Sequence, residues 1–364
     1  MVKVGIPRAL SYYRHFPFWK TLLEGLGAEV IVSRQTGRRL LEEGTMHCVD
    51  DICVPVKLYY GHVLDLKDSV DRVFVSRMVS VEKRDCDTYT CPKLIGLPDM
   101  IKNSFDDLPP IVDFVVDVQN RSLKKSAGRL AAQLGAPRSS VRKSLAAALE
   151  VERSYQRELL RGLDPESAMK VVLPATDNGN GAGSGPAGQQ GEATGHPLRR
   201  LESRDNRFPG RLSFPSGAAE GKRGNINIAL VGHEYLIHDP FISHNLPARL
   251  ERLGANVILM TQVAPEVIER ELKRYPDISW SYEKELLGAA SHFLGREEVD
   301  GVMMVMGFAC GPDSIISEII IREVRREDSP PFTTLVLDEH TGVAGVNTRV
   351  EAFVDLIRRS GSRT

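Results

Sequence analysis

The sequence has no excess of charge of either sign and no long hydrophobic run. Its 364 residues include 47 lysines and arginines against 48 aspartates and glutamates, so the formal net charge is −1. Nucleic-acid binding needs a basic surface, and this balance argues against it. No apolar run reaches the length of a membrane span, and the first residues, MVKVGIPRAL, read as a strand rather than a signal peptide. We therefore expect a cytoplasmic protein that binds neither nucleic acid nor membrane.

Several common catalytic motifs are also missing. No G-x-G-x-x-G sequence follows an expected strand, there is no P-loop lysine pattern and no serine nucleophile elbow, and Gly307 to Gly311 resembles a phosphate-binding turn only loosely. Cysteine is scarce, at five residues. An odd count without an export signal argues against a disulfide framework. In a reducing compartment, a group of thiols is more often metal-binding or catalytic.

Three of the cysteines share one local setting. Cys53 in ICVPVK, Cys91 in YTCPKL and Cys310 in FACGPDS are each followed within two residues by proline, at the start of a helix-like stretch. Proline is favoured in the first helical turn, so each sulfur is expected at a helix N-terminus, where the helix dipole favours thiolate. Three gathered thiolates would leave one coordination position open. That arrangement suits a reactive iron–sulfur cluster better than a closed structural zinc site.

Other interpretations of the cysteines stay open at this point. A lone cysteine is most often a small buried hydrophobic residue. Cys48 and Cys86 each lie five residues before a member of the trio, which gives two C-x4-C pairs, a weak match to a ferredoxin pattern. Cys86, in the polar loop KRDCDTYT, is either an auxiliary ligand or a free surface thiol. Cys48 precedes two aspartates and is interpreted as a bystander.

Strand-like and helix-like segments alternate along the chain. In the first half we expect strands at 2–6, 28–33, 72–76 and 111–117, and helices within FPFWKTLLEGLG, at 55–66, at 92–103 and in two pieces over 121–162. In the second half we expect strands at 227–231, 255–260, 301–306 and 333–337, and helices at 243–253, 264–274, 282–295, 313–326 and 346–359. This order predicts an α/β protein with two Rossmann-like (flavodoxin-like) domains and mainly parallel sheets.

The expected domains are separated by a segment of different composition. The run DNGNGAGSGPAGQQGEATGHP has almost no large apolar side chains and cannot offset its ordering entropy. We predict a cysteine-bearing α/β domain over 1–165, a flexible Gly-rich linker or insertion over 166–224, and a second α/β domain over 225–364.

Polar residues follow several of the expected strands, where ligands collect in open α/β sheets. Glu339 and His340, in the segment DEHTG, are candidate catalytic residues, and the alternative is an ordinary turn with a helix cap. His233 and His238 follow another strand, and we interpret them mainly as loop hydrogen-bonding residues. Asp313 and Ser314 are expected to cap the helix after Gly311 and to support the cluster sulfurs.

Five blocks of the sequence together resemble a known family. They are VKVGIPRALSYYRHFPFWKTLLEGLGAEV, VDDICVPVKLYYGHV, VSVEK with YTCPKLIGLPDM, GFACGPDSIISEII and LDEHTGVAGVNTRVEAFVD. They resemble acyl-CoA dehydratase activase-related proteins, relatives of 2-hydroxyacyl-CoA dehydratase (2-hydroxyglutaryl-CoA dehydratase) and benzoyl-CoA reductase subunits. The resemblance covers roughly 1–160 and 225–358 and does not include the ATPase segment of the true activators.

The resemblance implies a cofactor and a range of functions. In the dehydratases, three cysteines per subunit hold a 4Fe-4S cluster between Rossmann-like domains, and these ligands correspond to Cys53, Cys91 and Cys310. The implied function is low-potential electron transfer or radical chemistry on an acyl-CoA or another small substrate, in an anaerobe. The implied partner is an ATP-dependent activator or another electron donor protein. A non-catalytic electron carrier or scaffold, and a zinc-bound structural protein, are the alternatives.

Overall fold

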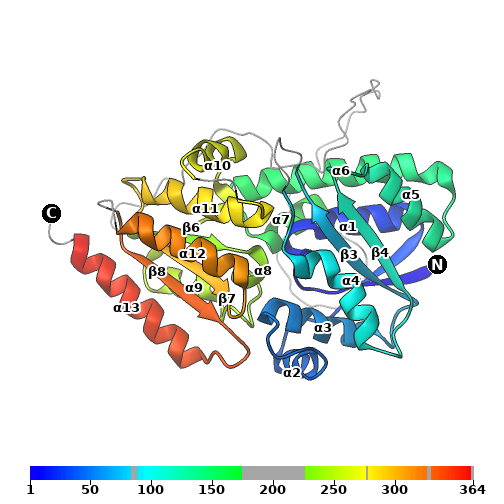
Figure 1. The fold of residues 1–364 in the computed structure, drawn as a ribbon, viewed down its shortest axis with the longest axis horizontal. Helices are drawn as coiled ribbons and strands as arrows, with labels where there is room; N and C mark the ends of the chain where they lie inside the picture. Colours follow the sequence, from blue (N-terminus) through cyan, green and yellow to red (C-terminus); the bar gives the residue numbers. More distant parts are fainter. Residues whose placement is uncertain (83–87, 174–225, 276–277, 326–328, 362–364) are drawn as a thin grey trace, which may run out of the picture.

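The computed structural model describes residues 1–82, 88–173, 226–275, 278–325 and 329–361. Within these ranges the chain forms two four-stranded sheets in which all neighbouring strands are parallel. Figure 1 shows the two sheets side by side, each with helices packed around it. The predicted α/β class with parallel sheets is therefore confirmed.

The first sheet has the strand order β2-β1-β3-β4. Its strands are β1 (Val2–Ile6), β2 (Ala28–Val32), β3 (Arg72–Ser80) and β4 (Ile111–Asp117). The helices of this half are α1 (Tyr12–Gly25), α2 (Arg38–Met46), α3 (Val54–Leu66), α4 (Pro92–Ser104), α5 (Leu123–Leu134), α6 (Arg138–Leu160) and α7 (Pro165–Val172). The direction of winding reverses between β1 and β3, as in flavodoxin-like sheets.

Helices cover both faces of this sheet. α1 packs against β2 and α6, and α5 packs against β4 and α6, so these helices share one face. α3 contacts β1, and α4 contacts β3 and β4, on the opposite face, as right-handed crossovers require. The ring of Trp19 on α1 lies 5.1 Å from that of Phe74 on β3 and 5.0 Å from that of Phe114 on β4, which packs α1 against these two strands.

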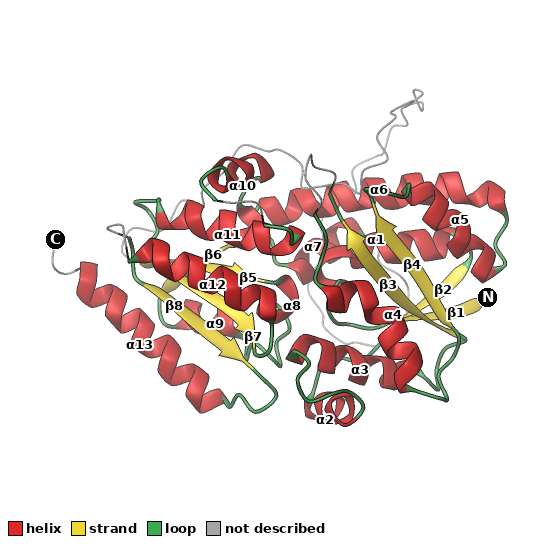
Figure 2. Ribbon diagram, in the orientation of Figure 1, coloured by secondary structure: helices red, strands yellow, loops and turns green. Residues whose placement is uncertain are grey.

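The second sheet has the equivalent strand order, β6-β5-β7-β8. Its strands are β5 (Ile226–Gly232), β6 (Ala255–Leu259), β7 (Gly301–Gly307) and β8 (Phe332–Leu337). The helices of this half are α8 (Glu234–Ile237), α9 (Leu246–Arg252), the 3-10 helix η1 (Met260–Gln262), α10 (Pro265–Leu272), α11 (Ser281–Leu294), α12 (Gly311–Val324) and α13 (Val343–Gly361). Figure 2 shows β7 and β8 ending toward the half that carries β1 to β4.

Alternate residues of β5 face two separate cores. Ile228 and Leu230 pack with apolar residues of α9 and α13, whereas Ala229 and Val231 pack with residues of α10, α11 and α12. β7 is buried at every position, as its uninterrupted apolar sequence GVMMVMG predicts for a strand covered on both faces. The second sheet is thus a helix–sheet–helix sandwich.

Helix α3 lies between the two sheets and belongs to the core of each. Val56, Tyr59 and Val63 are part of the first core, whereas Val54 and Leu58 are part of the second. The helix is buried at every position from Val54 to Val63. A helix buried on all sides lies inside the protein, and here it joins the two halves.

Helix α1 begins at Tyr12, earlier than the sequence pattern indicated, and contains Pro17. Proline inside a helix leaves the carbonyl four residues before it without its usual N–H donor. That carbonyl belongs to Tyr13, and the hydroxyl of Tyr155 on α6 donates to it at 2.6 Å. A tertiary hydrogen bond therefore replaces the missing helical one.

The predicted strands and helices are present with small shifts in their bounds, and some further elements were not predicted. α2, α7, α8 and η1 are short, from three to nine residues, and carry too little apolar periodicity to be recognised. α7 lies at the start of the expected linker and packs against α1 and α6. From residue 174 onward that linker lies outside the described residues, so the domain boundaries stay a prediction.

Among the described helices, none is long and apolar enough to cross a membrane.

Candidate functional site at the junction of the two sheets

Each sheet has a topological switch point, where ligands collect in open α/β sheets. In the first sheet it lies beyond the carboxyl ends of β1 and β3, and in the second beyond those of β5 and β7. The loops after β1 and β7 contain Leu10 and Ala309, non-glycine residues with φ of 50° and 62°. Such backbone strain often accompanies functional loops. Ala309 directly precedes Cys310.

The three cysteines of the shared motif lie at the starts of three helices, as predicted. Cys53 is the N-cap residue of α3, Cys91 that of α4 and Cys310 that of α12, each with proline in the first turn. None of the three side chains makes a capping hydrogen bond. The proline-based prediction of sulfur atoms at helix N-termini is therefore confirmed.

The starts of these helices come together at the junction. Cys53 is 8% exposed and belongs to the first core, and Cys91 and Cys310 pack against that same core. The ammonium group of Lys93 on α4 donates to the carbonyl of Ala309 at 3.3 Å. Residues separated by more than two hundred positions in the sequence are thus neighbours in space.

Burial opposes the expected preference for thiolate at all three cysteines. Burial, followed by the influence of Cys91 and Asp313 among others, raises the pKa of Cys53 to about 11. Burial also raises the pKa of Cys91, and burial and the Asp313 carboxylate raise that of Cys310 well above its usual range. Backbone N–H groups of the first helical turns act in the opposite direction but are outweighed. The effect of desolvation on the pKa of these thiols therefore exceeds that of the helix dipole. A bound cation would be needed to hold the sulfurs as thiolates.

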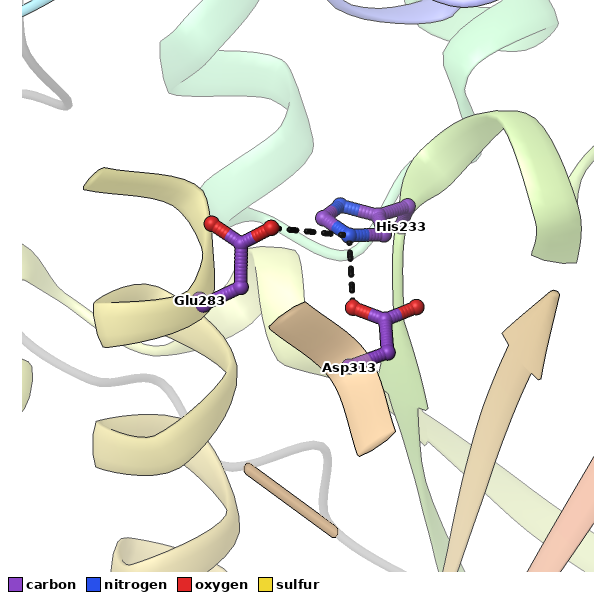
Figure 3. Close-up of side chains that lie close together, drawn as sticks. All are labelled: His233, Glu283 and Asp313. Atoms are coloured by element: carbon purple, nitrogen blue, oxygen red, sulfur yellow. Dashed lines mark hydrogen bonds and ion pairs between the residues drawn. The ribbon is translucent and has the colours of Figure 1, made fainter. Parts of the chain in front are cut away.

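A separate group of potential metal ligands lies beside Cys310. Among the described residues, one set of three or more His, Cys, Asp and Glu side chains has ligand atoms within 4.8 Å of one another, and it is His233, Glu283 and Asp313. Figure 3 shows one oxygen of each carboxylate directed at Nε2 of His233. The distance from Nε2 is 3.0 Å to Asp313 and 4.0 Å to Glu283. We call this set the buried triad.

His233 and Glu283 of the buried triad have shifted pKa values. Burial disfavours the charged form of His233, but Asp313, Glu283 and Glu234 outweigh burial and raise its pKa to about 9. Burial raises the pKa of Glu283, with His233 opposing the shift. The neighbouring carboxyl groups therefore favour the charged form of His233.

The predicted roles of Asp313 and Ser314 need correction. α12 begins at Gly311 with Cys310 as its N-cap, so Asp313 is the third helical residue and its carboxylate is directed to His233 rather than to a cap. The hydroxyl of Ser314 donates to the carbonyl of Cys310 at 2.8 Å and does not cap the helix. Both residues still lie next to Cys310. His233, interpreted from the sequence mainly as a loop residue, is buried in this triad.

The two candidate catalytic residues of the DEHTG segment differ in environment. Glu339 forms an ion pair with Lys57 of α3, and although burial opposes it, this pairing lowers the pKa of Glu339. His340 is exposed, and its backbone N–H donates to the Asp338 carboxylate at 2.9 Å, within an ordinary turn. The turn alternative thus describes His340, whereas Glu339 fastens the loop before α13 to the helix that begins at Cys53.

The remaining candidates are Cys48, His238 and Cys86. The thiol of Cys48 donates to the carbonyl of Thr45 at 3.7 Å, and burial raises its pKa. His238 is the C-cap residue of α8, and burial lowers its pKa to about 4. Cys86 falls in the segment 83–87, which the structure does not describe.

A narrow pocket lies between the two switch points. Its lining includes Ser11, Arg14, Met78, Leu94, His233 and Tyr282. The guanidinium of Arg14 binds both carboxylate oxygens of Glu285 at 2.6 and 2.7 Å and lies 4.5 Å from the centre of the Tyr282 ring. This pocket connects the loop after β1 with His233 of the buried triad.

Tyr235 also lines this pocket and links the triad to the cysteines. Its ring stacks on that of His233, with centroids 4.9 Å apart and an interplanar angle of 12°. Burial, and then the charges of Asp313, Cys310 and Cys53, raise its pKa well above the usual range, so its hydroxyl stays protonated. Sequence reasoning missed Tyr235, Arg14 and Glu283, because each lies within or beside a helix and carries no motif of its own.

Comparison with known proteins places most of the chain in one family. Residues 3–263 match the CoA enzyme activase uncharacterised domain (DUF2229). The matched region includes Cys53, Cys91 and His233, and it ends before Glu283 and Cys310. No curated protein matches the chain. Since the matched residues make up more than half of the sequence, the protein belongs to the CoA enzyme activase uncharacterised domain family.

Proposed function

We propose that this protein is a 4Fe-4S protein of the 2-hydroxyacyl-CoA dehydratase type, with Cys53, Cys91 and Cys310 as the cluster ligands. The observation that carries the proposal is the position of these residues. Three cysteines remote in sequence are the N-cap residues of three helices that start at one junction. The family match, through its reference to CoA enzyme activases, supports the same class of chemistry.

The residues at the junction fit such a cluster. No sulfur of the trio is used in a capping hydrogen bond, and the helix N-termini supply backbone N–H groups that favour negative charge. Three thiolates with one coordination position left open suit a reactive iron–sulfur cluster better than a closed structural zinc ion.

A cluster held by three protein thiolates supplies one-electron chemistry at low potential and leaves one iron open to another ligand. The chain's own residues exclude water and orient the site. Cys53 is fixed by a helix buried between two cores, and Tyr235 presents a protonated hydroxyl beside Cys53 and Cys310. We propose a small acyl compound, such as an acyl-CoA thioester, as the substrate class. An ATP-dependent activator or another electron donor protein would supply the electron.

Anaerobic purification followed by iron and sulfide analysis tests this proposal. We expect about four iron and four sulfide per chain, with broad visible absorption that a zinc protein lacks. Zinc without iron or sulfide would overturn the proposal. Activity on acyl-CoA thioesters, with a reductant and an ATPase partner, separates the enzyme from its alternative, a non-catalytic electron carrier or scaffold.

A further inference from the structure

The carboxylate of Glu283 is placed unusually for a buried charge. The residue is 2% exposed, Oε2 has no hydrogen-bond partner, and Oε1 lies 4.0 Å from Nε2 of His233, beyond hydrogen-bonding distance. Asp313 is also fully buried, and its Oδ2 has no partner. Burying an unsatisfied carboxylate oxygen costs free energy unless a partner or a cation compensates. Two such oxygens in one triad indicate that a partner is missing.

The positions of the three side chains are set by rigid elements. His233 directly follows β5, and Glu283 and Asp313 are each the third residue of a helix, α11 and α12. At that helical position a carboxylate commonly turns back to the N-cap backbone. Here both turn instead toward one imidazole nitrogen, as Figure 3 shows. Three separate elements of the fold, and no single local turn, therefore bring these side chains together.

The charge balance of the triad suits a divalent cation. Two buried carboxyl groups beside one imidazole are costly to bury as anions unless positive charge compensates them. One divalent ion bound by two carboxylates and a neutral imidazole gives a site with no net charge.

The distances also suit one ion. Donors bound to a single metal at about 2.1 Å lie about 3.0–3.4 Å from one another. The pair His233–Asp313, at 3.0 Å, is already at that separation. Glu283, at 4.0 Å, needs a movement of less than about one ångström, within reach of a side-chain adjustment. One nitrogen and two carboxylates form a mixed donor set that suits Mn²⁺, Fe²⁺ or Zn²⁺ better than Mg²⁺ or Cu⁺.

We infer that His233, Glu283 and Asp313 bind one first-row divalent metal ion, at a site separate from the three cysteines. Three protein ligands leave coordination positions open, and the pocket that His233 lines provides the route of entry. Tyr235, stacked on His233, holds the imidazole plane. This inference goes beyond the proposed function and does not depend on it, because the two sites share no ligand.

Mn²⁺ is the first probe, because it is paramagnetic and avoids thiolate ligands. Titration of the full-length chain with Mn²⁺, followed by the loss of the free-ion paramagnetic signal, should give one bound ion per chain. Coupling of the bound ion to a histidine nitrogen should be visible in the unmutated protein. Zn²⁺ should displace Mn²⁺, following the usual order of affinity.

Isosteric variants identify the ligands. Glu283→Gln and Asp313→Asn should each weaken Mn²⁺ binding by about 10- to 100-fold or more. Glu318→Gln is the matched control, because Glu318 lies on α12 but pairs with Arg322 at the surface. Cys53→Ser should keep Mn²⁺ binding, and Glu283→Gln should keep iron and sulfide, so the two proposals fail independently.

Two results would overturn the inference. One is the absence of Mn²⁺ binding to the unmutated chain, with no rise in its thermal unfolding temperature when Mn²⁺ is added. The other is binding without histidine-nitrogen coupling and with unchanged affinity in Asp313→Asn. Either result would mean that the buried triad is only a His–carboxylate interaction and not a metal site. If Glu283→Gln fails to fold, Asp313→Asn and the coupling measurement on the unmutated chain still decide the question.

Discussion

Individual residues at the junction show what sequence patterns predict and what they miss. The Cys-to-Pro spacing correctly predicted helix starts at Cys53, Cys91 and Cys310, because proline restricts the backbone locally. It did not predict their raised pKa values, because burial depends on the whole fold. Glu283 was missed for the same reason, since a glutamate in the first turn of an ordinary helix carries no signal for a buried ligand.

His62 gives a test of burial at the level of a single residue. Its Nδ1 lies 2.9 Å from Ser33 Oγ and its Nε2 lies 3.0 Å from Thr36 Oγ1, and burial lowers its pKa to about 4. In the unfolded chain histidine has a pKa near 6.5, so below that pH the unfolded chain binds more protons than the folded chain. The stability that depends on neutral His62 is therefore present above that pH and is lost on acidification. Between about pH 7 and about pH 5, His62 should reduce the free energy of unfolding by about 2 kcal/mol.

Chemical denaturation at both pH values measures this loss. The variant His62→Gln should lose less stability on acidification than the unmutated chain, and His340→Gln, at an exposed position, should match the unmutated chain. An equal pH dependence in all three proteins would show that His62 is not buried in its neutral form.

At the scale of elements, α3 is the part of the fold that positions the site. It carries Cys53 at its start, Lys57 one turn later, and apolar side chains in both cores. Its continuous burial requires close packing against α2. A Cβ atom added at Gly61 would lie 1.9 Å from the carbonyl oxygen of Leu40, so only glycine fits there.

Gly61→Ala should therefore separate α2 from α3 and destabilise the protein by about 2–4 kcal/mol, the range of severe overpacking. Gly96→Ala on α4 is the matched control, because its nearest new contact is Met100 Sδ at 3.9 Å. The control should be neutral or stabilising by about 0.5–1 kcal/mol, the gain in helix propensity. Thermal or chemical unfolding measures both, and a tolerated Gly61→Ala would contradict the close α2–α3 contact.

Long alternating elements could be predicted from the sequence, and short ones could not. Apolar periodicity correctly predicted the strands VKVGI and AEVIV and the helix between them. It also predicted the break at Gly135 between α5 and α6. α2 escaped because RRLLEEGTM buries little more than Leu40 and Leu41. Its packing partner, α3, decides its conformation, and that contact is not visible in local sequence.

On the scale of the whole molecule, ion pairs and hydrogen bonds join the two halves around the site. Arg14 of α1 binds Glu285 of α11, Lys57 of α3 binds Glu339 after β8, and Thr36 donates to Asp239. These contacts hold the two switch points against each other. The sequence predicted a shared site from three cysteines but gave no indication of the charged residues that join its two sides.

The Lys57–Glu339 pair tests this connection. Lys57 is 4% exposed, so Lys57→Met leaves a partly buried carboxylate unpaired and should destabilise the protein by about 3 kcal/mol. Replacing both partners, as in Lys57→Met with Glu339→Leu, should recover most of that loss. The exposed pair Arg38–Glu42 is the control, and Arg38→Ala should change stability by less than about 0.5 kcal/mol. If the double variant is as unstable as Lys57→Met alone, the pair does not act as a unit.

The most direct test of the central claim is the iron and sulfide content of single cysteine variants purified without oxygen. Cys53→Ser, Cys91→Ser and Cys310→Ser should each lose most of the cluster, because each removes one of three protein ligands. Cys48→Ala is the matched control and should keep the full content, because its thiol lies at the end of α2, hydrogen-bonded to Thr45. Loss of iron in Cys48→Ala equal to that in Cys53→Ser, or unchanged iron in Cys310→Ser, would contradict a cluster held by these three residues at the junction.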